Sequence, residues 1–225
     1  MTAGKNIWAQ VDHYAAASLL AADPAMEAVL AHNRAGGLPA IDVSPLQGKF
    51  LDLVVRMCGA RRVLEIGTLG GYSTIWMARA LPAGGTVVTL ELEERHAAVA
   101  SRNFATAGVG DRIDLRVGPA LSSLEKLGKE GAAPFDLIFI DADKPNNERY
   151  LVWAMRLARP GTVIICDNVI RDGAVIEAGS RDASVQGARD VFSFFGNRGK
   201  LEATALQTVG EKGYDGFAMA IVSES

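Results

Sequence analysis

The sequence lacks several features that would place it in other classes of protein. Its 225 residues contain no apolar run approaching the ~20 residues that span a bilayer. Gln10, Asp12 and His13 interrupt the short apolar stretch near the start, so we expect neither a signal peptide nor a membrane partner. The formal net charge is only −3, which gives no electrostatic case for nucleic acid as a partner.

Cysteine and histidine are scarce as well. Cys58 and Cys166 lie far apart in apolar contexts, which predicts buried thiols in a reducing compartment and therefore a cytoplasmic protein. The histidines show no paired spacing, so we expect no zinc site; they are His13, His32 and His96. With 49% hydrophobic and 22% charged residues, the composition is that of an ordinary globular chain.

What the sequence does contain is an alternation of short apolar runs with helix-like stretches. The runs begin about 25 residues apart, which is the length of a strand, a crossover helix and two loops. Such continuous apolar strands predict a mostly parallel sheet with helices on both faces, an α/β fold. The predicted strands are residues 61–67, 86–92, 112–117, 135–141 and 162–167.

The two ends of the chain depart from this rhythm. The first part is predicted to be helical, at residues 7–20, 24–35 and 45–58. We therefore predict one domain over residues 1–225, with a helical extension at 1–60 and an α/β core at 61–225. Near the end, 204–210 and 217–223 predict an antiparallel hairpin joined by the turn-rich EKGYDG. A surface stretch, 175–187, is predicted to be a mobile loop and a candidate lid before a helix at 188–196.

The stretch VLEIGTLGGYST, residues 63–74, is a strand that runs directly into glycines. A phosphate-binding loop of the Walker type needs a lysine that is absent here. A dinucleotide fingerprint is also absent, because residue 69 is Leu and Gly70 and Gly71 come one step late. The loop can still bring backbone N–H groups close to a ligand, and a carboxylate with an adenosine fits better than a pyrophosphate. The alternative is that the glycines only make a tight turn.

Glu91 lies at the C-terminal end of the second predicted strand, some 20–25 residues after the glycine loop. A carboxylate at that point can accept hydrogen bonds from both ribose hydroxyls of a nucleoside. This favours nucleoside binding without separating NAD from S-adenosylmethionine. The alternative is a solvated acid at the start of a helix.

A second group of polar residues follows the fourth and fifth predicted strands. Asp141 ends one strand, and Asp167 and Asn168 end the next. Because parallel neighbours lie ~4.8 Å apart, these oxygen ligands are expected to converge. Such a set suits a hard cation, Mg²⁺ first, with Mn²⁺ or Ca²⁺ able to substitute. Helix capping is the alternative for either aspartate alone.

Four motifs together, VLEIGTLGGYST, LELEE, FIDADK and CDNVIRDG, resemble the cation-dependent, S-adenosylmethionine-dependent O-methyltransferases of the caffeoyl-CoA and catechol type. The resemblance runs in order from residues 43–48 to 213–222. It implies a class I methyltransferase, with a Rossmann-like sheet of seven strands whose last strand is reversed. It also implies a homodimer.

The resemblance assigns roles by position. It places the cofactor at Val43, Glu65, Gly67, Thr68, Ser73, Glu91, Ala120, Asp141 and Asp143. It places a divalent metal at Asp141, Asp167 and Asn168, and it makes Lys144 and Asp141 the catalytic residues, with Lys144 as the base. The implied reaction methylates one hydroxyl of a small aromatic diol, because a metal bound to both oxygens acidifies and orients them.

The pattern departs from many plant members after Asn168, where Arg171 and Asp172 replace residues that shape the acceptor pocket. Arg171 is predicted either to contact an acidic or ester-bearing acceptor or to pair with Asp172. Two other functions stay open at this point: a nicotinamide-dependent dehydrogenase, and a nucleoside-binding or regulatory module without turnover.

Overall fold

The computed structural model describes residues 2–132, 134–196 and 199–224. Their contacts divide the chain into two compact units. One is Ala15–Leu124; the other combines Met1–Tyr14 with Glu125–Ser225. The expectation of one domain stays a prediction.

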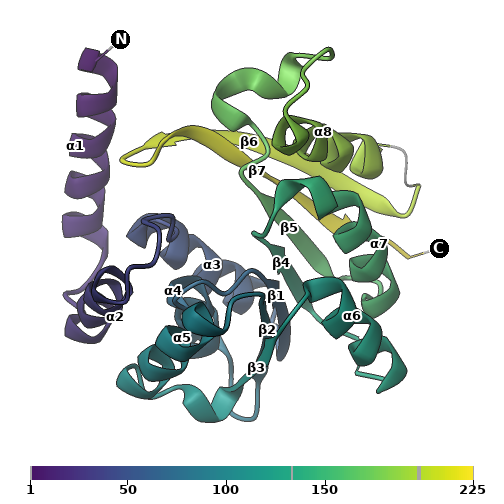
Figure 1. The fold of residues 1–225 in the computed structure, drawn as a ribbon, viewed down its shortest axis with the longest axis horizontal. Helices are drawn as coiled ribbons and strands as arrows, with labels where there is room; N and C mark the ends of the chain where they lie inside the picture. The colour runs from purple at the N-terminus through teal and green to yellow at the C-terminus, as the bar shows by residue number, and fades with distance from the viewer. Residues whose placement is uncertain (1, 133, 197–198, 225) are drawn as a thin grey trace. The chain divides into compact units, whose positions relative to one another are not determined.

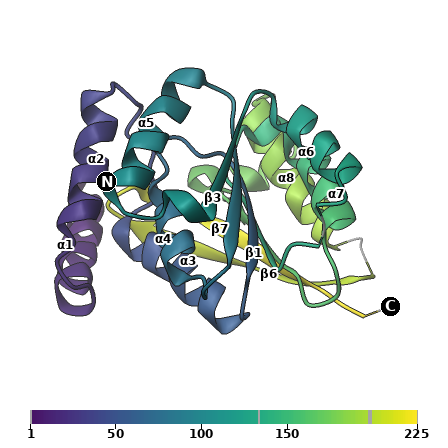
Figure 2. The same cartoon turned by 90° about the horizontal axis from the view of Figure 1, so that it is seen from below.

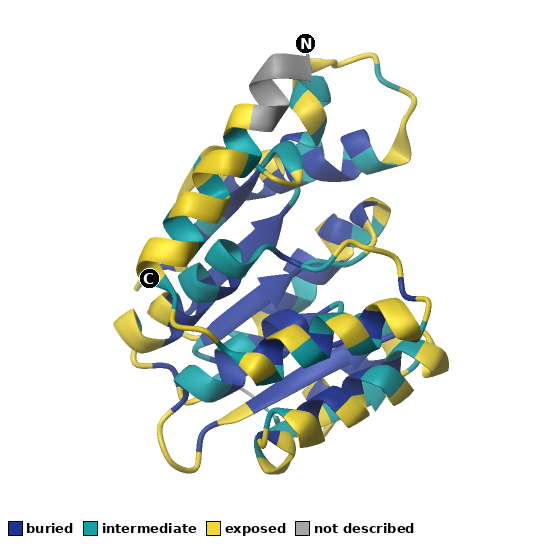
Figure 3. Ribbon diagram, turned by 90° about the vertical axis from the view of Figure 1, so that its left-hand side faces the viewer, coloured by how far each residue is buried: buried dark blue, intermediate teal, exposed yellow. Residues whose placement is uncertain are grey.

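The unit Ala15–Leu124 contains three parallel strands. β2 pairs with β1 on one side and with β3 on the other, with Glu65 opposite Thr89 and Leu90 opposite Arg116. β1 and β2 are almost wholly buried; in Figure 3 buried strands are dark blue. The elements, drawn in Figure 1, are α2 (Pro24–Ala35), α3 (Pro45–Met57), β1 (Arg62–Ile66), α4 (Tyr72–Ala80), β2 (Thr86–Glu91), α5 (Glu94–Thr106), η1 (Gly110–Arg112), β3 (Ile113–Val117) and the first part of α6 (Ala120–Lys129).

Two helices of this unit begin where the sequence supplies both a side-chain cap and a proline. Asp23 accepts a hydrogen bond from the Met26 N–H at 3.2 Å, and Pro24 is the first residue of α2. Ser44 accepts from the Gln47 N–H at 3.1 Å, ahead of Pro45 in α3. Such caps satisfy N–H groups that have no partner inside the helix, so these boundaries follow the sequence closely.

The other unit pairs two strands of the alternating part with the terminal hairpin. β4 is parallel to β5, whereas β7 runs antiparallel to both β5 and β6. Figure 2 shows α7 and α8 side by side, and they are in contact. The elements are α1 (Thr2–Leu19, of which the first part belongs to this unit), β4 (Leu137–Ile140), η2 (Lys144–Asn146), α7 (Asn147–Leu157), β5 (Val163–Asp167), η3 (Arg171–Ile176), α8 (Ala183–Gly196), β6 (Leu201–Gly210) and β7 (Gly213–Val222).

The strand order is β3-β2-β1-β4-β5-β7-β6, a sheet of seven strands. β7, the last strand in the chain, is antiparallel to both of its neighbours. The predicted α/β class, with a mostly parallel sheet and a reversed last strand, is therefore confirmed. None of the helices formed by the described residues is both long and apolar enough to cross a membrane.

Two predicted segments differ from the structure. β7 already begins at Gly213, so only residues 211 and 212 lie between the strands, and most of EKGYDG belongs to the strand. The candidate lid is shorter than predicted, because α8 begins at Ala183. There the Asp182 side chain accepts a hydrogen bond from the Ser184 N–H at 2.7 Å, so polar residues that suggested a loop start the helix instead.

Candidate functional site

The glycine loop connects β1 to α4 through backbone conformations that side chains disfavour. Gly67 has φ 105° and Gly71, the residue before α4, has φ 81°. Leu69 between them also has a positive φ, 51°. The left-handed region is readily open only to glycine, so the first and last glycines are explained by the turn itself.

Gly70 is explained by its neighbours. A Cβ added there would lie 2.0 Å from the Asn33 Oδ1 atom, because the Asn33 side chain occupies that space. Asn33 in turn accepts from Asn103 at 2.8 Å, and Asn103 also donates to the Gly70 carbonyl at 2.8 Å. His32 lies 2.8 Å from the Asn103 Oδ1 atom. Sequence reasoning missed this buried network, since its members lie on α2 and α5, far apart in the chain.

Glu65 is a fully buried carboxylate near the end of β1. It accepts hydrogen bonds from the Ser73 hydroxyl at 2.5 Å, from the Thr89 hydroxyl at 2.6 Å and from the Thr74 hydroxyl. Thr68 joins the same group through Thr89, with 2.6 Å between the two oxygens. The carboxylate thereby ties the start of α4 to β1 and β2. The structure brings Glu65, Thr68 and Ser73 together as predicted neighbours of the glycine loop; their contact with a cofactor stays a prediction.

Glu91, at the end of β2, is 6% exposed and holds the glycine loop from the other side. One carboxylate oxygen accepts from the Leu69 N–H at 2.7 Å, and the other accepts from the Glu93 N–H at 3.0 Å. His96 Nδ1 lies 3.3 Å from the second oxygen. A carboxylate oxygen can accept two hydrogen bonds, so a ribose hydroxyl is still compatible with these contacts.

The remaining cofactor residues of this unit lie near its helix starts. Val43 is buried and directly precedes Ser44, the cap of α3. Ala120 is half-buried and is the first residue of α6. Neither position is tested further by the structure, and both assignments stay predictions.

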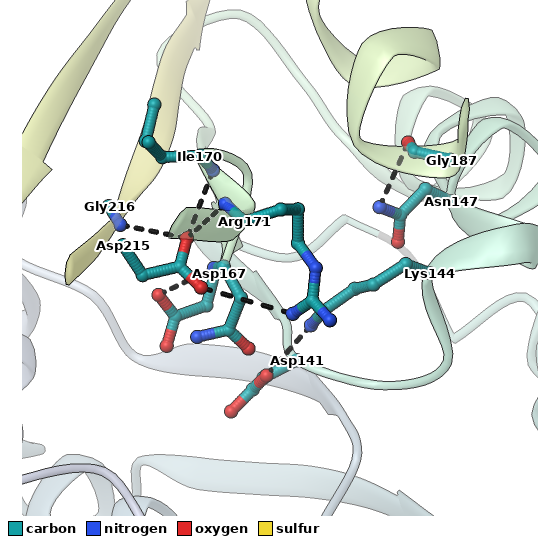
Figure 4. A network of polar contacts seen from close by, with 10 residues as sticks. Asp141, Lys144, Asn147, Asp167, Ile170, Arg171, Gly187, Asp215 and Gly216 are labelled. Atoms are coloured by element: carbon teal, nitrogen blue, oxygen red, sulfur yellow. Dashed lines mark hydrogen bonds and ion pairs between the residues drawn. The ribbon is translucent and has the colours of Figure 1, made fainter. Parts of the chain in front are cut away.

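In the other unit, the ends of β4 and β5 carry the predicted metal ligands. Ile140 pairs with Cys166 in the parallel register, so Asp141 and Asp167 occupy the next position of adjacent strands. Parallel neighbours lie ~4.8 Å apart, so the two residues follow adjacent strand ends; their binding of one cation stays a prediction. Asp167 is buried and accepts a hydrogen bond from the Asn168 N–H at 2.8 Å. Figure 4 shows this network from close by.

Lys144 is the buried lysine of this group, with 7% of its surface exposed. Its Nζ atom donates to Asp141 Oδ1 at 3.0 Å. α8 packs directly on its backbone, because a Cβ added at Gly187 would lie 1.9 Å from the Lys144 carbonyl oxygen. Asn147 donates to the Gly187 carbonyl at 3.2 Å and fixes the same contact. The lysine is therefore held in place by β4 and α8, unlike a solvated surface lysine.

Asp143 does not join the pair formed by Asp141 and Lys144 and has other hydrogen-bond partners. It is exposed, and it accepts from the Tyr150 hydroxyl at 2.5 Å and from the Asn146 amide at 2.6 Å. Burial, and secondly the hydrogen bond to Asp143, raise the pKa of Tyr150, so the phenol stays a donor. Contact of Asp143 with the cofactor stays a prediction.

The predicted ligand set fits a divalent cation by its chemistry. Two carboxylates and an amide oxygen are the donors that Mg²⁺ prefers, and two of them occupy matched strand positions. No cluster of three or more His, Cys, Asp or Glu side chains able to hold a metal occurs among the described residues. The set of Asp141, Asp167 and Asn168, which includes an amide, stays a prediction.

A sheet of this order, with a glycine loop after β1 and an acid at the end of β2, is typical of the doubly wound α/β class of proteins. The sequence pattern of the O-methyltransferase family matches residues 20–197. The chain belongs to the O-methyltransferase family, which confirms the resemblance seen in its motifs.

Two relatives and one solved structure show how similar the chain is to known members. It is 51% identical to a catechol O-methyltransferase of Niastella koreensis, over 96% of this chain and 98% of the relative. It is 53% identical to a catechol O-methyltransferase of Mycobacterium tuberculosis, over 94% of each. An O-methyltransferase from Bacillus cereus, solved in complex with SAH, is 55% identical with a TM-score of 0.96, over 97% of this chain and 99% of that one.

Proposed function

We propose that the protein transfers a methyl group from S-adenosylmethionine to one hydroxyl of a small aromatic vicinal diol, with the help of a divalent cation. The observation that carries the proposal is the pairing of buried Lys144 with Asp141, one strand away from Asp167 at the same register. A buried lysine beside a carboxylate suits a base for a hydroxyl proton. The names of the close relatives and the SAH-bound structure support the cofactor and the reaction class.

Each group of residues has a distinct task in this proposal. The glycine loop and Glu91 bind the nucleoside and amino-acid parts of the cofactor. Asp141, Asp167 and Asn168 would hold a divalent cation, which would supply positive charge beside the two diol oxygens and so lower the pKa of the diol. Lys144 Nζ accepts the proton of the attacking hydroxyl, which requires the neutral amine. The oxygen then forms a bond to the methyl carbon as the carbon–sulfur bond breaks. Because opposite charges neutralise in this step, positioning dominates the rate.

Assembly and location are further parts of the proposal. We expect a homodimer of cytoplasmic chains, as the family resemblance implies. Large apolar side chains are exposed on two elements of one unit: Val11 and Tyr14 of α1, and Leu206 and Val209 of β6. Asp12 of α1 accepts from the Glu211 N–H at 2.8 Å and holds these elements together. An exposed apolar area of this kind supports an interface with a second copy. Sedimentation equilibrium should give twice the mass of one chain; a monomer at micromolar concentration would contradict this part.

The experiment that tests the reaction measures methyl transfer from labelled S-adenosylmethionine to caffeate, caffeoyl-CoA and dihydroxyphenylalanine. The assay is run with Mg²⁺ and again with EDTA, and the Asp167→Ala variant serves as the matched control. We expect product with Mg²⁺ only, and none from the variant although it still binds the cofactor. Product that still forms in EDTA would contradict the proposed metal dependence. Cofactor binding without product from any diol would favour the regulatory module, and binding of NADH in its place would favour the dehydrogenase.

A further inference from the structure

The segment that follows β5 has an unusual backbone. Asn168 has φ 54°, Arg171 has φ 56° and Asp172 has φ 54°, and Gly173 continues at φ 90°. Residues with a Cβ seldom adopt the left-handed region, and three of them within five residues persist only when the surroundings hold them there. Asn168, a predicted metal ligand, is the first of the three.

Asp215 of β7 stabilises this backbone conformation through hydrogen bonds. Its Oδ1 atom accepts hydrogen bonds from the N–H groups of Ile170 at 2.9 Å, Arg171 at 3.0 Å and Gly216 at 3.0 Å. Its Oδ2 atom lies 3.8 Å from Arg171 Nη1. Figure 4 shows these contacts converging on one carboxylate. Arg171 is thus paired with Asp215, and the predicted pair with Asp172 is not the one formed.

The absence of a side chain at the next position of β7 makes this contact possible. A Cβ added at Gly216 would lie 2.7 Å from Ile170 Cγ1 and 2.2 Å from the Leu206 carbonyl oxygen. The Gly216 carbonyl also accepts from the Val169 N–H at 3.0 Å. The segment after β5 is therefore bonded to β7 by backbone and side chain together.

We propose that Asp215 is a positioning residue for the metal site: it fixes the left-handed segment so that Asn168 and Asp167 present their oxygens to one cation. The inference rests on the proposed metal dependence. It is motivated by the hydrogen bond from the Asn168 N–H to Asp167 Oδ1 at 2.8 Å, through which the backbone of this segment also orients the Asp167 carboxylate. Outer groups that orient ligands typically change metal affinity by about 10–100-fold.

The test is a Mn²⁺ titration followed by electron paramagnetic resonance on the full chain, without cofactor or acceptor. We expect Asp215→Ala to weaken Mn²⁺ binding by about 10–100-fold. Asp215→Asn keeps the oxygen that accepts from three N–H groups, so an affinity between those of wild type and Asp215→Ala is expected. Asp12→Ala is the matched control, because Asp12 also accepts a backbone N–H, that of Glu211, at the turn of the same hairpin. Its affinity should equal that of wild type.

A compensating variant separates positioning from a general effect on the fold. The substitution Asp172→Gly places glycine at this position, and glycine adopts the left-handed conformation readily. Added to Asp215→Ala, it should restore part of the lost Mn²⁺ affinity. No restoration, or an equal loss in Asp12→Ala, would overturn the positioning role, as would wild-type affinity in a folded Asp215→Ala protein. Wild-type protein that binds no Mn²⁺, or an Asp167→Ala variant that binds it normally, would instead contradict the metal site itself.

Discussion

The carboxylates in the two groups of candidate site residues differ in their burial and in their hydrogen-bond partners. Glu65, in the glycine-loop unit, is fully buried and accepts from three hydroxyls. Asp141, in the other unit, has a side chain that is 22% exposed and accepts from Lys144 Nζ. A buried carboxylate that accepts several hydrogen bonds from the protein stabilises the structure. A partly exposed carboxylate beside a lysine can take part in chemistry. We therefore expect substitutions in the first group to cost stability and those in the second to cost activity.

The largest expected effect is that of Lys144→Met on turnover. A general base typically contributes about 10²–10⁴-fold, so kcat should fall by that factor if Lys144 accepts the hydroxyl proton. The variant should keep its affinity for S-adenosylmethionine and its unfolding midpoint, because methionine fills a similar volume. Initial rates at saturating cofactor and acceptor, together with calorimetric binding of the cofactor, provide the measurement.

Lys129→Met is the control for that variant. Lys129 also pairs with a carboxylate one helical turn away, Glu125 at 2.6 Å, but its side chain is 75% exposed. Activity should be unchanged there. If both variants retained full activity, Lys144 would not be the base. The expectation that substitutions in the second group of site residues reduce activity would then be wrong for Lys144.

The next largest effect is that of Glu65→Gln on stability. The amide keeps the size of the side chain but replaces one acceptor oxygen with a donor that faces hydroxyl groups. Leaving buried polar groups unsatisfied costs about 1–3 kcal/mol each, so we expect the free energy of unfolding to fall by about 2–4 kcal/mol. Urea denaturation measures this change. Ser73→Ala removes a single donor and should cost about 1 kcal/mol. Equal losses in the two variants would mean that Glu65 does not organise the group.

The local elements were predictable because they rest on short-range signals. The strand rhythm, the caps at Asp23 and Ser44, and the polar residues at the ends of β4 and β5 all follow from neighbouring residues. The motifs also identified the family, which the comparisons confirm.

The supports of the site could not be predicted, because they join residues far apart in the chain. Asn33 fills the space beside Gly70, and Asp215 binds the backbone of Ile170 and Arg171 across 45 and 44 residues. No local pattern marks an asparagine inside a helix or an aspartate in a strand as a partner of a distant loop. The same holds for Gly187, whose small size matters only because the Lys144 backbone lies against it.

The smallest expected effect concerns the two thiols, one in each unit. Cys58 is half-buried, not fully buried as predicted, whereas Cys166 is fully buried on β5. Burial raises the pKa of Cys166 from 9 to about 12, with a smaller opposing effect of Lys144. We expect Ellman's reagent at pH 8 to modify Cys58 in the folded protein and Cys166 only after unfolding, with no change in activity. Cys58→Ser protein should then give no reaction until denaturant is added.

The same pKa shift fixes the sign of a pH effect. A folded-state pKa above the unfolded value means that the native thiol holds its proton more tightly than the unfolded one. Its contribution to stability is complete below about pH 9 and is lost as the pH rises from 9 to about 12. Wild type should therefore lose stability more steeply over that range than Cys166→Ala, in urea midpoints measured at several pH values. Parallel curves for the two proteins would mean that Cys166 ionises as easily in the folded as in the unfolded chain, and that its surroundings beside Lys144 are wetter than the packing of β5 indicates.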